Sequence, residues 1–433
     1  MLSDNANNTS NTNNTGRRLP ELLAPAGSLD KLKIAIHYGA DAVYMGGAAY
    51  SLRAHAVLKM EEIAAAVSYA HERGVRVFIT INIMAHNSDL SGLRDYLRRL
   101  RDMRVDGLII SDPGIFALAR KWVPEINIHI STQANITNSA SAVFWQGQGA
   151  SRVNLARELT LAEIKEIRAD TNIKLEVFVH GALCISYSGR CSLSLYMTGR
   201  DANHGNCAHP CRYRYILEEE KRPGQYFPVE EDGHGTYIFN SRDLCLLHRL
   251  PELMAAGVDS IKIEGRMKSV YYVGAVVRLY RAALDYIAAR RETTEAAAIT
   301  LPAAMNDELA KIGSRGYTEN FFDGPPEQQD MLYSGIKYAQ THAPVGLVRQ
   351  VDGRKLIEVR NQIISGDWIE YLEPGFKQQQ TRIIRINNEK GELEKANPGN
   401  MVELQTEPPI VDWQVNGLLR RKQSENGMGQ GAG

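Results

Sequence analysis

Four of the five cysteines lie between positions 184 and 211, and their thiols are the clearest candidates for metal chemistry in this sequence. Cys184, Cys191, Cys207 and Cys211 are spaced Cys-X6-Cys-X15-Cys-X3-Cys on a polar stretch that contains glycines. Thiolates bind soft metals, and an iron–sulfur cluster uses four of them. Structural zinc sites commonly use two Cys-X2-Cys pairs, which are absent here, so the spacing favours a cluster. Zinc and unligated thiols remain alternatives on spacing alone. Cys245 is the spare cysteine, expected on a helix as a core thiol.

A second set of candidates follows two apolar segments. His180 comes directly after Leu175–Val179 and is a candidate proton donor or hydrogen-bonding group. In the alternating segment further on, Lys262, Glu264 and Arg266 should share one face. Charges on an inner face are costly unless they are paired or functional. A structural ion-pair network is therefore the alternative to binding of an anionic substrate by Arg266, whose guanidinium group suits carboxylates.

Other apolar segments are also followed by polar residues. These residues are Asn82, Asp112, Gln133, Asn135, Arg157 and Glu158. Any one of them could be a helix cap, since Asn and Asp are common in that role. In a (βα)8 barrel, however, the carboxyl ends of all strands meet at one mouth, where such enzymes hold their chemistry. The whole set therefore favours one shared site.

Eight short apolar segments alternate with amphipathic helices from Glu21 onward. The apolar segments are 22–24, 42–45, 75–83, 107–111, 127–132, 152–156, 175–179 and 260–264. This alternation predicts an α/β fold with a parallel sheet that is covered on both faces. A doubly wound sheet fits too, but the polar strand ends favour a (βα)8 TIM-like barrel. A ninth strand-like segment, Thr236–Asn240, is assigned to an excursion that follows the cysteines.

Shifts in composition divide the chain into parts. We expect a disordered Asn/Thr-rich tail at 1–18, a TIM-like barrel at 19–293 with a cysteine module at 184–215 and a flap at 216–235, a connecting segment at 294–337, a C-terminal β domain at 338–412 and a flexible tail at 413–433. The β domain is predicted by short alternating strands separated by glycine-containing turns, and we expect a small all-β barrel.

Bulk properties narrow the class of protein. The chain is 44% hydrophobic and 23% charged with a formal net charge of zero, so its overall charge does not predict a nucleic-acid partner. No apolar run is long enough to span a membrane, and the N-terminus lacks the apolar core of a secretory signal. We therefore expect a cytoplasmic protein without structural disulfides. The GxSxG, HExxH and P-loop motifs are absent, which argues against serine hydrolases and zinc proteases.

Three clusters of basic and aromatic residues are candidates for binding single-stranded RNA. Bases stack on aromatic rings, and phosphates pair with Arg and Lys. The clusters are Arg212, Tyr213, Arg214 and Tyr215; Tyr271, Tyr272, Arg278, Tyr280 and Arg281; and Lys311, Arg315 and Tyr317. Each cluster is weak on its own, because amphipathic helices commonly carry such residues.

The stretch EVFVHGALCISYSGRCSLS resembles the signature of the collagenase-like U-32 peptidase family. The segments ELLAPAG, GADAVYMGG, STQAN, SIKIEGRMKS and RGYT match the barrel of the same family, and the likeness covers about residues 19–409. Within the family, the chain is most similar to the branch of prephenate-dependent tRNA wobble-uridine hydroxylases.

This resemblance implies conversion of the wobble uridine of tRNA to 5-hydroxyuridine. It implies a 4Fe-4S cluster on Cys184, Cys191, Cys207 and Cys211, with prephenate as co-substrate. The catalytic candidates are then His180, Glu264, Arg266 and Arg157. The substrate-binding candidates are Asn82, Gln133, Asn135, Lys262, Arg212 and Tyr317.

Two other activities stay open from the resemblance. Sister branches hydroxylate other substrates, including a ribosomal RNA cytidine, so another RNA base is an alternative. The family name implies peptidase activity, but no nucleophile–base pair or metalloprotease motif is evident in the sequence. Peptidase activity is therefore the second alternative. The resemblance also leaves open a homologous partner subunit.

Overall fold

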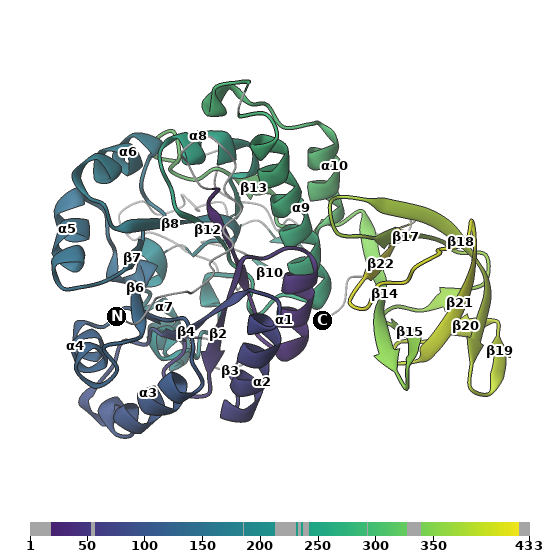
Figure 1. Ribbon diagram of the computed structural model, residues 1–433, viewed down its shortest axis with the longest axis horizontal. Coiled ribbons are helices and arrows are strands. Elements are labelled where there is room, and N and C mark those ends of the chain that lie inside the picture. Colours follow the sequence, from purple (N-terminus) through teal and green to yellow (C-terminus); the bar gives the residue numbers. More distant parts are fainter. Residues whose placement is uncertain are drawn as a thin grey trace, which may run out of the picture.

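The computed structural model describes residues 19–52, 57–184, 186–212, 231–232, 235–236, 242–291, 293–326 and 339–423. These residues form a larger α/β domain followed by a smaller β domain (Figure 1). The predicted tail at 1–18, residues Tyr213–Tyr215 and most of the predicted flap lie outside the described residues. In the part of the chain that is described, no helix is both long and apolar enough to cross a membrane.

A closed barrel of parallel strands forms the larger domain. The strands pair in the order β12–β1–β2–β4–β5–β6–β7–β8, and β8 pairs back with β12. Their bounds are β1 Glu21–Pro25, β2 Ala42–Gly47, β4 Arg76–Ile81, β5 Gly107–Ile110, β6 Asn127–Ile130, β7 Arg152–Asn154, β8 Lys174–Ala182 and β12 Ser260–Ile263. The eight predicted strands are all present, and the TIM-like barrel is confirmed.

Helices cover the outside of this barrel (Figure 1). Their bounds are α1 Leu29–His37, α2 Met60–His71, α3 Leu93–Asp102, α4 Pro113–Trp122, α5 Ser139–Gly147, α6 Leu161–Asp170, α8 Leu250–Ala255, α9 Val270–Ala288 and α10 Ala304–Lys311. Side chains in the strand–helix turns cap several of them, as the Ser28 hydroxyl does by accepting from the backbone N–H of Lys31. The Asp112 carboxylate likewise accepts from the backbone N–H of Ile115. Asp112, one of the polar strand-end residues, is therefore a helix cap.

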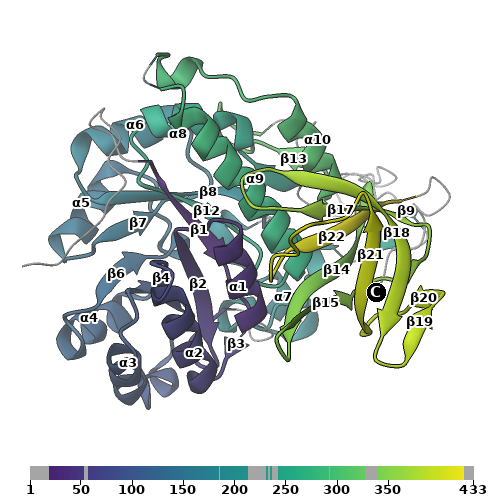
Figure 2. The same cartoon turned by 45° about the vertical axis from the view of Figure 1, so that its right-hand side comes forward.

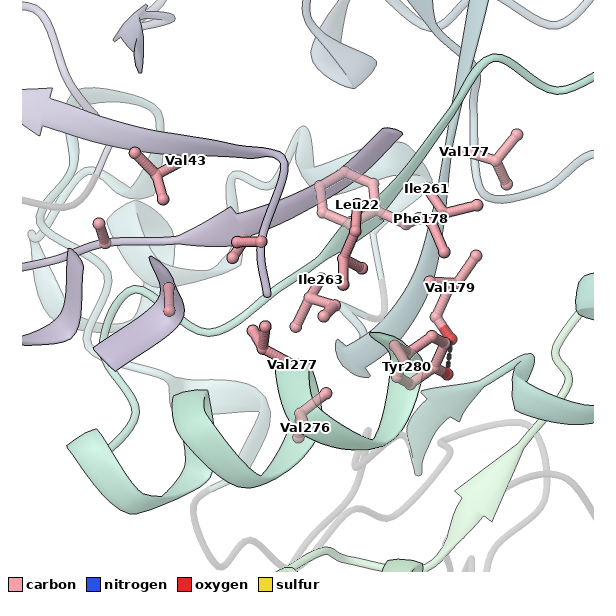
Figure 3. Packing of buried hydrophobic residues seen from close by; sticks show 14 of the residues in the cluster. Leu22, Val43, Val177, Phe178, Val179, Ile261, Ile263, Val276, Val277 and Tyr280 are labelled. Atoms are coloured by element: carbon pink, nitrogen blue, oxygen red, sulfur yellow. Dashed lines mark hydrogen bonds between the residues drawn. The ribbon is translucent and has the colours of Figure 1, made fainter. Parts of the chain in front are cut away.

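Helix α9 holds the strands on which the candidate site is built. Val276 and Val277 face Ile261 and Ile263 of β12 across the apolar layer between helix and barrel (Figure 3). The Tyr280 hydroxyl donates to the carbonyl oxygen of Val179 at 2.8 Å (Figure 3). Burial of these side chains fixes α9 against β8 and β12.

Three short strands extend the barrel sheet. They are β3 Val57–Leu58, β11 Asp243–Cys245 and β13 Tyr317–Thr318. Strand β11 pairs antiparallel with β8, and β13 pairs parallel with β11. The prediction that Cys245 lies on a helix is wrong, because pairing with β8 holds it in an extended strand. Within the ninth candidate segment, Thr236 belongs to β10 (Gly235–Thr236), which pairs with β9 (Glu231–Asp232) away from the barrel sheet.

The smaller domain is a closed antiparallel barrel, as predicted. Strands pair in the order β17–β22–β14–β15–β21–β18–β19, and β17 also pairs with β18. Their bounds are β14 His342–Val351, β15 Arg354–Val359, β17 Trp368–Leu372, β18 Gln378–Asn388, β19 Gly391–Leu393, β21 Met401–Glu407 and β22 Leu418–Lys422, with β16 Ile363–Ile364 and β20 Lys395–Ala396 as a separate pair. The expected boundary at 413 is wrong, because β22 joins β14 and β17 and buries Leu418 and Leu419.

The β domain lies beside α1, α9 and α10 of the large barrel (Figure 2), and a buried ionic cluster joins the two domains there. Arg420 of β22 donates to both carboxylate oxygens of Glu308 at 2.9 and 2.7 Å, and Arg278 of α9 reaches the same carboxylate at 3.3 Å. The Tyr38 hydroxyl donates to the Leu372 carbonyl at 2.8 Å. Because these groups are buried and mutually bonded, the β domain is anchored to the large barrel.

Candidate active site at the barrel mouth

The floor of the candidate site is a buried network of charges inside the barrel. Lys262 Nζ lies 2.9 Å from Glu176, and Arg152 lies 2.9 Å from Glu176 and 2.6 Å from Glu21. Burial raises the pKa of the Glu176 carboxyl, but Lys262 and Arg152 outweigh burial and hold this pKa below its ordinary value. For Lys262, the geometry is that of the structural ion-pair network and not of a free substrate-binding cation.

Arg266 and Glu264 lie above this floor, at the carboxyl end of β12. One Arg266 nitrogen, Nη1, donates to the hydroxyls of Ser51 and Thr80, each at 2.9 Å. Glu264 accepts a hydrogen bond from the Tyr44 hydroxyl at 3.1 Å. The two residues therefore face the ends of β2 and β4 across the mouth, as their alternation in sequence predicts.

Asn82 and Gln133 also meet at the mouth. Asn82 donates to the Gln133 side-chain oxygen at 2.9 Å, and Ser131 donates to the same oxygen at 2.5 Å. Arg190, from the cysteine module, donates to the backbone carbonyl of Gln133 at 2.6 Å. Asn135 has a left-handed backbone (φ 55°), and its buried Oδ1 has no hydrogen-bond partner among the described residues.

Arg157 connects the ends of β7 and β8. Its guanidinium carbon lies 4.0 Å from the centre of the Phe178 ring, and Nη1 donates to the carbonyl of Ala182 at 3.2 Å. Its buried Nε has no hydrogen-bond partner among the residues that are described. Since a buried donor without an acceptor is costly, this N–H is suited to a ligand oxygen.

His180 points away from the mouth. A bulge in the β8–β12 pairing aligns His180 with Ile263, whose side chain packs outward against α9. The His180 ring consequently lies among the rings of Tyr272, Tyr280 and Tyr317, at centroid distances of 6.0, 5.4 and 5.4 Å. Alternation along β8 cannot anticipate this, because a bulge shifts the side on which the next residue lies.

The protonation of His180 follows from its neighbours. Burial lowers the pKa of His180 to about 4, so its imidazole is neutral at pH 7. Tyr280 donates its single proton to Val179, so His180 Nδ1, 3.3 Å away, must donate to the Tyr280 oxygen. Nε2 is then an acceptor, and it has no hydrogen-bond partner within the described parts of the chain.

The cysteine module lies beside the mouth and is attached to the barrel at several points. It contains the short helix α7 (Leu193–Thr198). Glu158, which follows β7, accepts from the backbone N–H of Ser188 at 2.6 Å. His204 lies 2.7 Å from Asp201 and 3.4 Å from Asp89, and its hydrogen bond to Asp201 raises the pKa of His204.

The four clustered cysteines have the right chemistry for a metal cluster but are not gathered around one point. All four are free thiols; Cys184 is exposed, whereas Cys191, Cys207 and Cys211 are half-buried. Across the described residues, no three His, Cys, Asp or Glu side chains are placed to hold a metal ion. The donor types therefore fit an iron–sulfur cluster, whereas their arrangement here does not. Burial raises the pKa of the Cys245 thiol to about 11, which separates it from thiolate ligands.

The predicted RNA-binding clusters are mostly internal. Tyr271, Tyr272, Arg278 and Tyr280 are buried under the β domain or against the barrel. Arg315 is buried and paired with Asp243, while Lys311 is paired with Glu308 at 2.9 Å. The expectation that the buried members of these two clusters face RNA is wrong, because their side chains are used for packing and ion pairs inside the fold. For Arg212, the side chain lies outside what is described.

Comparison with known families agrees with this architecture. Residues 27–332 match Peptidase family U32, and residues 340–420 match the Peptidase family U32 C-terminal domain. The chain belongs to peptidase family U32. The two matches cover the TIM-like barrel and the C-terminal barrel in turn, so both domains of this U32 chain are accounted for.

Several curated U32 relatives carry names that refer to RNA. The chain is 40% identical to "tRNA hydroxylation protein P1" of Bacillus subtilis, over 87% of this chain and 89% of the relative. It is 36% identical to "tRNA hydroxylation protein P" of Escherichia coli, over 88% and 92%. It is 35% identical to the Escherichia coli "23S rRNA 5-hydroxycytidine C2501 synthase", over 78% of this chain and 47% of that protein.

Proposed function

We propose that this chain is an RNA hydroxylase that converts the wobble uridine of tRNA to 5-hydroxyuridine. The observation that carries the proposal is its similarity, over most of both chains, to relatives named tRNA hydroxylation proteins. The proposal includes a 4Fe-4S cluster, for which the cysteine quartet supplies the donor types, and prephenate as co-substrate, for which Arg266 and Arg157 are the cationic candidates at the mouth.

Within this proposal, Arg266 and Arg157 bind the anionic co-substrate. Prephenate is a dicarboxylate, and guanidinium groups form charge-assisted hydrogen bonds with carboxylates. Arg266 is held by Ser51 and Thr80, and Arg157 is held against Phe178, so little side-chain freedom would be lost on binding. Asn82 and Gln133, already bonded to each other, offer amide groups to the base.

Glu264 is the better candidate for proton transfer at the mouth. Its carboxylate lies on the inner side of the barrel end next to Tyr44, whereas the His180 ring lies on the outer side of β8. We therefore propose a positioning role for His180, through Tyr280 and the β8 bulge. Tyr317 shares this outer layer with His180, so direct contact of Tyr317 with the substrate is not part of the proposal.

The proposed 4Fe-4S cluster would use Cys184, Cys191, Cys207 and Cys211. When bound, such a cluster supplies electron transfer or an open iron site. Its assembly must draw the four thiols together, because they do not converge as described here. Cys184 is exposed and follows the end of β8 by two residues, so its thiol borders the mouth.

Mass spectrometry of tRNA nucleosides tests the reaction. A strain that lacks this gene and its homologues should lose 5-hydroxyuridine derivatives, and expression of the chain should restore them. Unchanged 5-hydroxyuridine derivatives in the deletion strain would reject the proposal. Loss of an rRNA hydroxycytidine instead would favour another RNA base, an alternative that rests on the rRNA-modifying relative.

Anaerobic purification followed by iron, sulfide and zinc analysis tests the cluster. Replacement of any one of the four clustered cysteines by Ala should remove iron and sulfide. Cys245→Ala is the matched control and should retain both, because this thiol is buried apart on β11. Stoichiometric zinc without sulfide would show a structural zinc site.

Gelatin digestion by the purified holoprotein tests the peptidase alternative. Digestion that is abolished by Glu264→Gln would support it.

A further inference from the structure

Helix α7 of the cysteine module carries an exposed apolar ridge, defined here as Leu195, Tyr196 and Met197. These side chains are 48%, 87% and 42% exposed. Of the predicted RNA-binding residues around α9 and α10, Tyr271, Tyr272, Arg278, Tyr280 and Arg315 are buried, so they do not offer an exposed surface to RNA. Contiguous exposed apolar side chains on a polar module commonly mark a binding surface.

The ridge is exposed because the opposite side of α7 is anchored. Ser194 is fully buried; its hydroxyl donates to the carbonyl of Arg200 at 2.7 Å and accepts from the backbone N–H of Ala208 at 3.0 Å. Thr198 donates to the carbonyl of Ser194 at 2.7 Å. With Ser194 fixed inward, Tyr196 lies about 200° further around the helix and points outward, and Leu195 and Met197 flank it with less exposure. The hydrogen bonds of Ser194 therefore fix the orientation of α7 and keep Tyr196 exposed.

The charge of the module suits a polyanion. Residues 186–212 contain three arginines, Arg190, Arg200 and Arg212, and a single acidic residue, Asp201. Asp201 already lies 2.7 Å from His204. Arg200 is exposed and follows Tyr196 by four residues, and its Nε donates to Asn206 at 3.1 Å. An exposed aromatic ring and an exposed guanidinium on one short segment offer a stacking platform and a phosphate contact.

We propose that the α7 ridge binds an unpaired base of the RNA substrate by stacking on Tyr196, while Arg200 contacts the adjacent phosphate. This inference rests on the proposed RNA hydroxylation and adds the surface that receives the RNA. Leu195 and Met197 border the stacked base and shield it from water. The ridge belongs to the module that carries the four cysteines, so it holds the RNA next to the proposed cluster.

Binding of an unmodified tRNA anticodon stem–loop to the full chain tests the surface. Tyr196→Ala should weaken binding about five- to 150-fold, the range of 1–3 kcal/mol for one base stacked on an aromatic ring. Tyr196→Phe should bind like the unchanged chain, because stacking requires the ring and not the hydroxyl. Arg200→Ala should reduce the slope of log affinity against log salt by about one.

Matched controls are available on other surfaces. Phe144 on α5 is 56% exposed, and Trp368 on β17 is 53% exposed. Phe144→Ala and Trp368→Ala should leave RNA affinity unchanged. Circular dichroism should show that every variant is folded, which is expected for substitutions of exposed side chains.

The outcomes separate this inference from the proposed function. If the unchanged chain binds the stem–loop and Tyr196→Ala binds equally well, the ridge is not the RNA surface, although the function stands. If the unchanged chain binds no tRNA, both fail. If Tyr196→Ala abolishes self-association in gel filtration and leaves RNA affinity intact, the ridge is a protein interface and the inference is overturned.

Discussion

Lys262 Nζ lies 2.9 Å from Glu176 inside the large barrel, where the two side chains are only 4% and 1% exposed. The pair spans β12 and β8, the strands whose contact closes the barrel. Arg152 approaches the same carboxylate from β7. These ion pairs occupy part of the interior that apolar side chains usually fill in such a barrel, and they link the two strands that close it.

Replacing Lys262 by Met should therefore destabilise the fold. The substitution leaves part of the Glu176 charge buried without its nearest cation, and loss of one partner of a buried pair typically costs about 3–5 kcal/mol. Because Arg152 remains, we expect the lower end of this range, measured as the free energy of unfolding in urea. Lys355→Met is the control, since its pair with Asp412 is exposed; equal effects of the two substitutions would contradict this account.

His180 should contribute to acid sensitivity. Its folded pKa of about 4 lies below its ordinary value of 6.5. The unfolded chain therefore takes up a proton first as the pH falls, and stability is lost between about pH 6.5 and pH 4. His180→Asn should retain a donor toward Tyr280 but show a smaller loss of urea midpoint between pH 7 and pH 5. An unchanged pH dependence would mean that His180 is not a source of the effect.

The sequence was sufficient to predict what depends on periodicity. Apolar runs alternating with helices predicted all eight barrel strands, and the charged alternation at Lys262, Glu264 and Arg266 predicted their common inward side. Turn residues predicted the C-terminal barrel. These features depend on the order of apolar, polar and turn residues within short segments, so they can be predicted from a single sequence.

Features that depend on tertiary partners were missed. The bulge that turns His180 outward leaves no trace in an apolar run. Cys245 adopts a strand because β8 is its neighbour, and β22 is a strand because it completes a distant sheet. Arg278 and Tyr280 resembled an RNA-binding face on a helix, yet their partners Glu308 and Val179 lie on other elements. In each example, the conformation or role of the residue is set by a partner that lies far away in the sequence and close in the fold.

Glu308 should control the docking of the C-terminal barrel. Its carboxylate is bonded to Arg420 and Arg278, whose side chains are 0% and 1% exposed. Glu308→Gln would leave the buried Arg278 without its carboxylate partner, whereas Arg420 keeps its pair with Glu370 at 2.7 Å. We therefore expect a loss near the lower end of about 3–5 kcal/mol in the free energy of unfolding. Limited proteolysis should then cut between the domains faster. Glu403→Gln, at an exposed pair with Arg354, is the control and should leave the proteolysis rate unchanged.

Glu370, at the same interface, should make the free energy of unfolding depend on pH. Burial raises its pKa, but the contacts with His342 and Arg420 outweigh burial and lower the pKa to about 2, from an ordinary value of 4.5. Its contribution is complete above pH 4.5 and is lost as the pH falls towards 2. Glu370→Gln should lower the urea midpoint at pH 7, and the difference from the unchanged chain should narrow below pH 4.5. If the difference in urea midpoint stayed the same at every pH, protonation of Glu370 would not be the source of the effect.

Gly46 should be required for the position of Arg266. A Cβ at this glycine would lie 2.2 Å from the Ser51 hydroxyl and 2.7 Å from Arg266 Nη1, so both side chains would have to move. Misplacement of a substrate-binding group by about 1 Å can cost on the order of a hundredfold in rate. Gly46→Ala should therefore reduce 5-hydroxyuridine formation by about ten- to a hundredfold, with iron content unchanged.

Gly147→Ala is the matched control for this substitution. Gly147 lies on α5, no neighbouring atom lies within 4 Å of the added Cβ, and the variant should retain full activity. If Gly46→Ala is fully active while Arg266→Lys is inactive, Arg266 tolerates displacement, and its hydrogen bonds to Ser51 and Thr80 do not set its catalytic position.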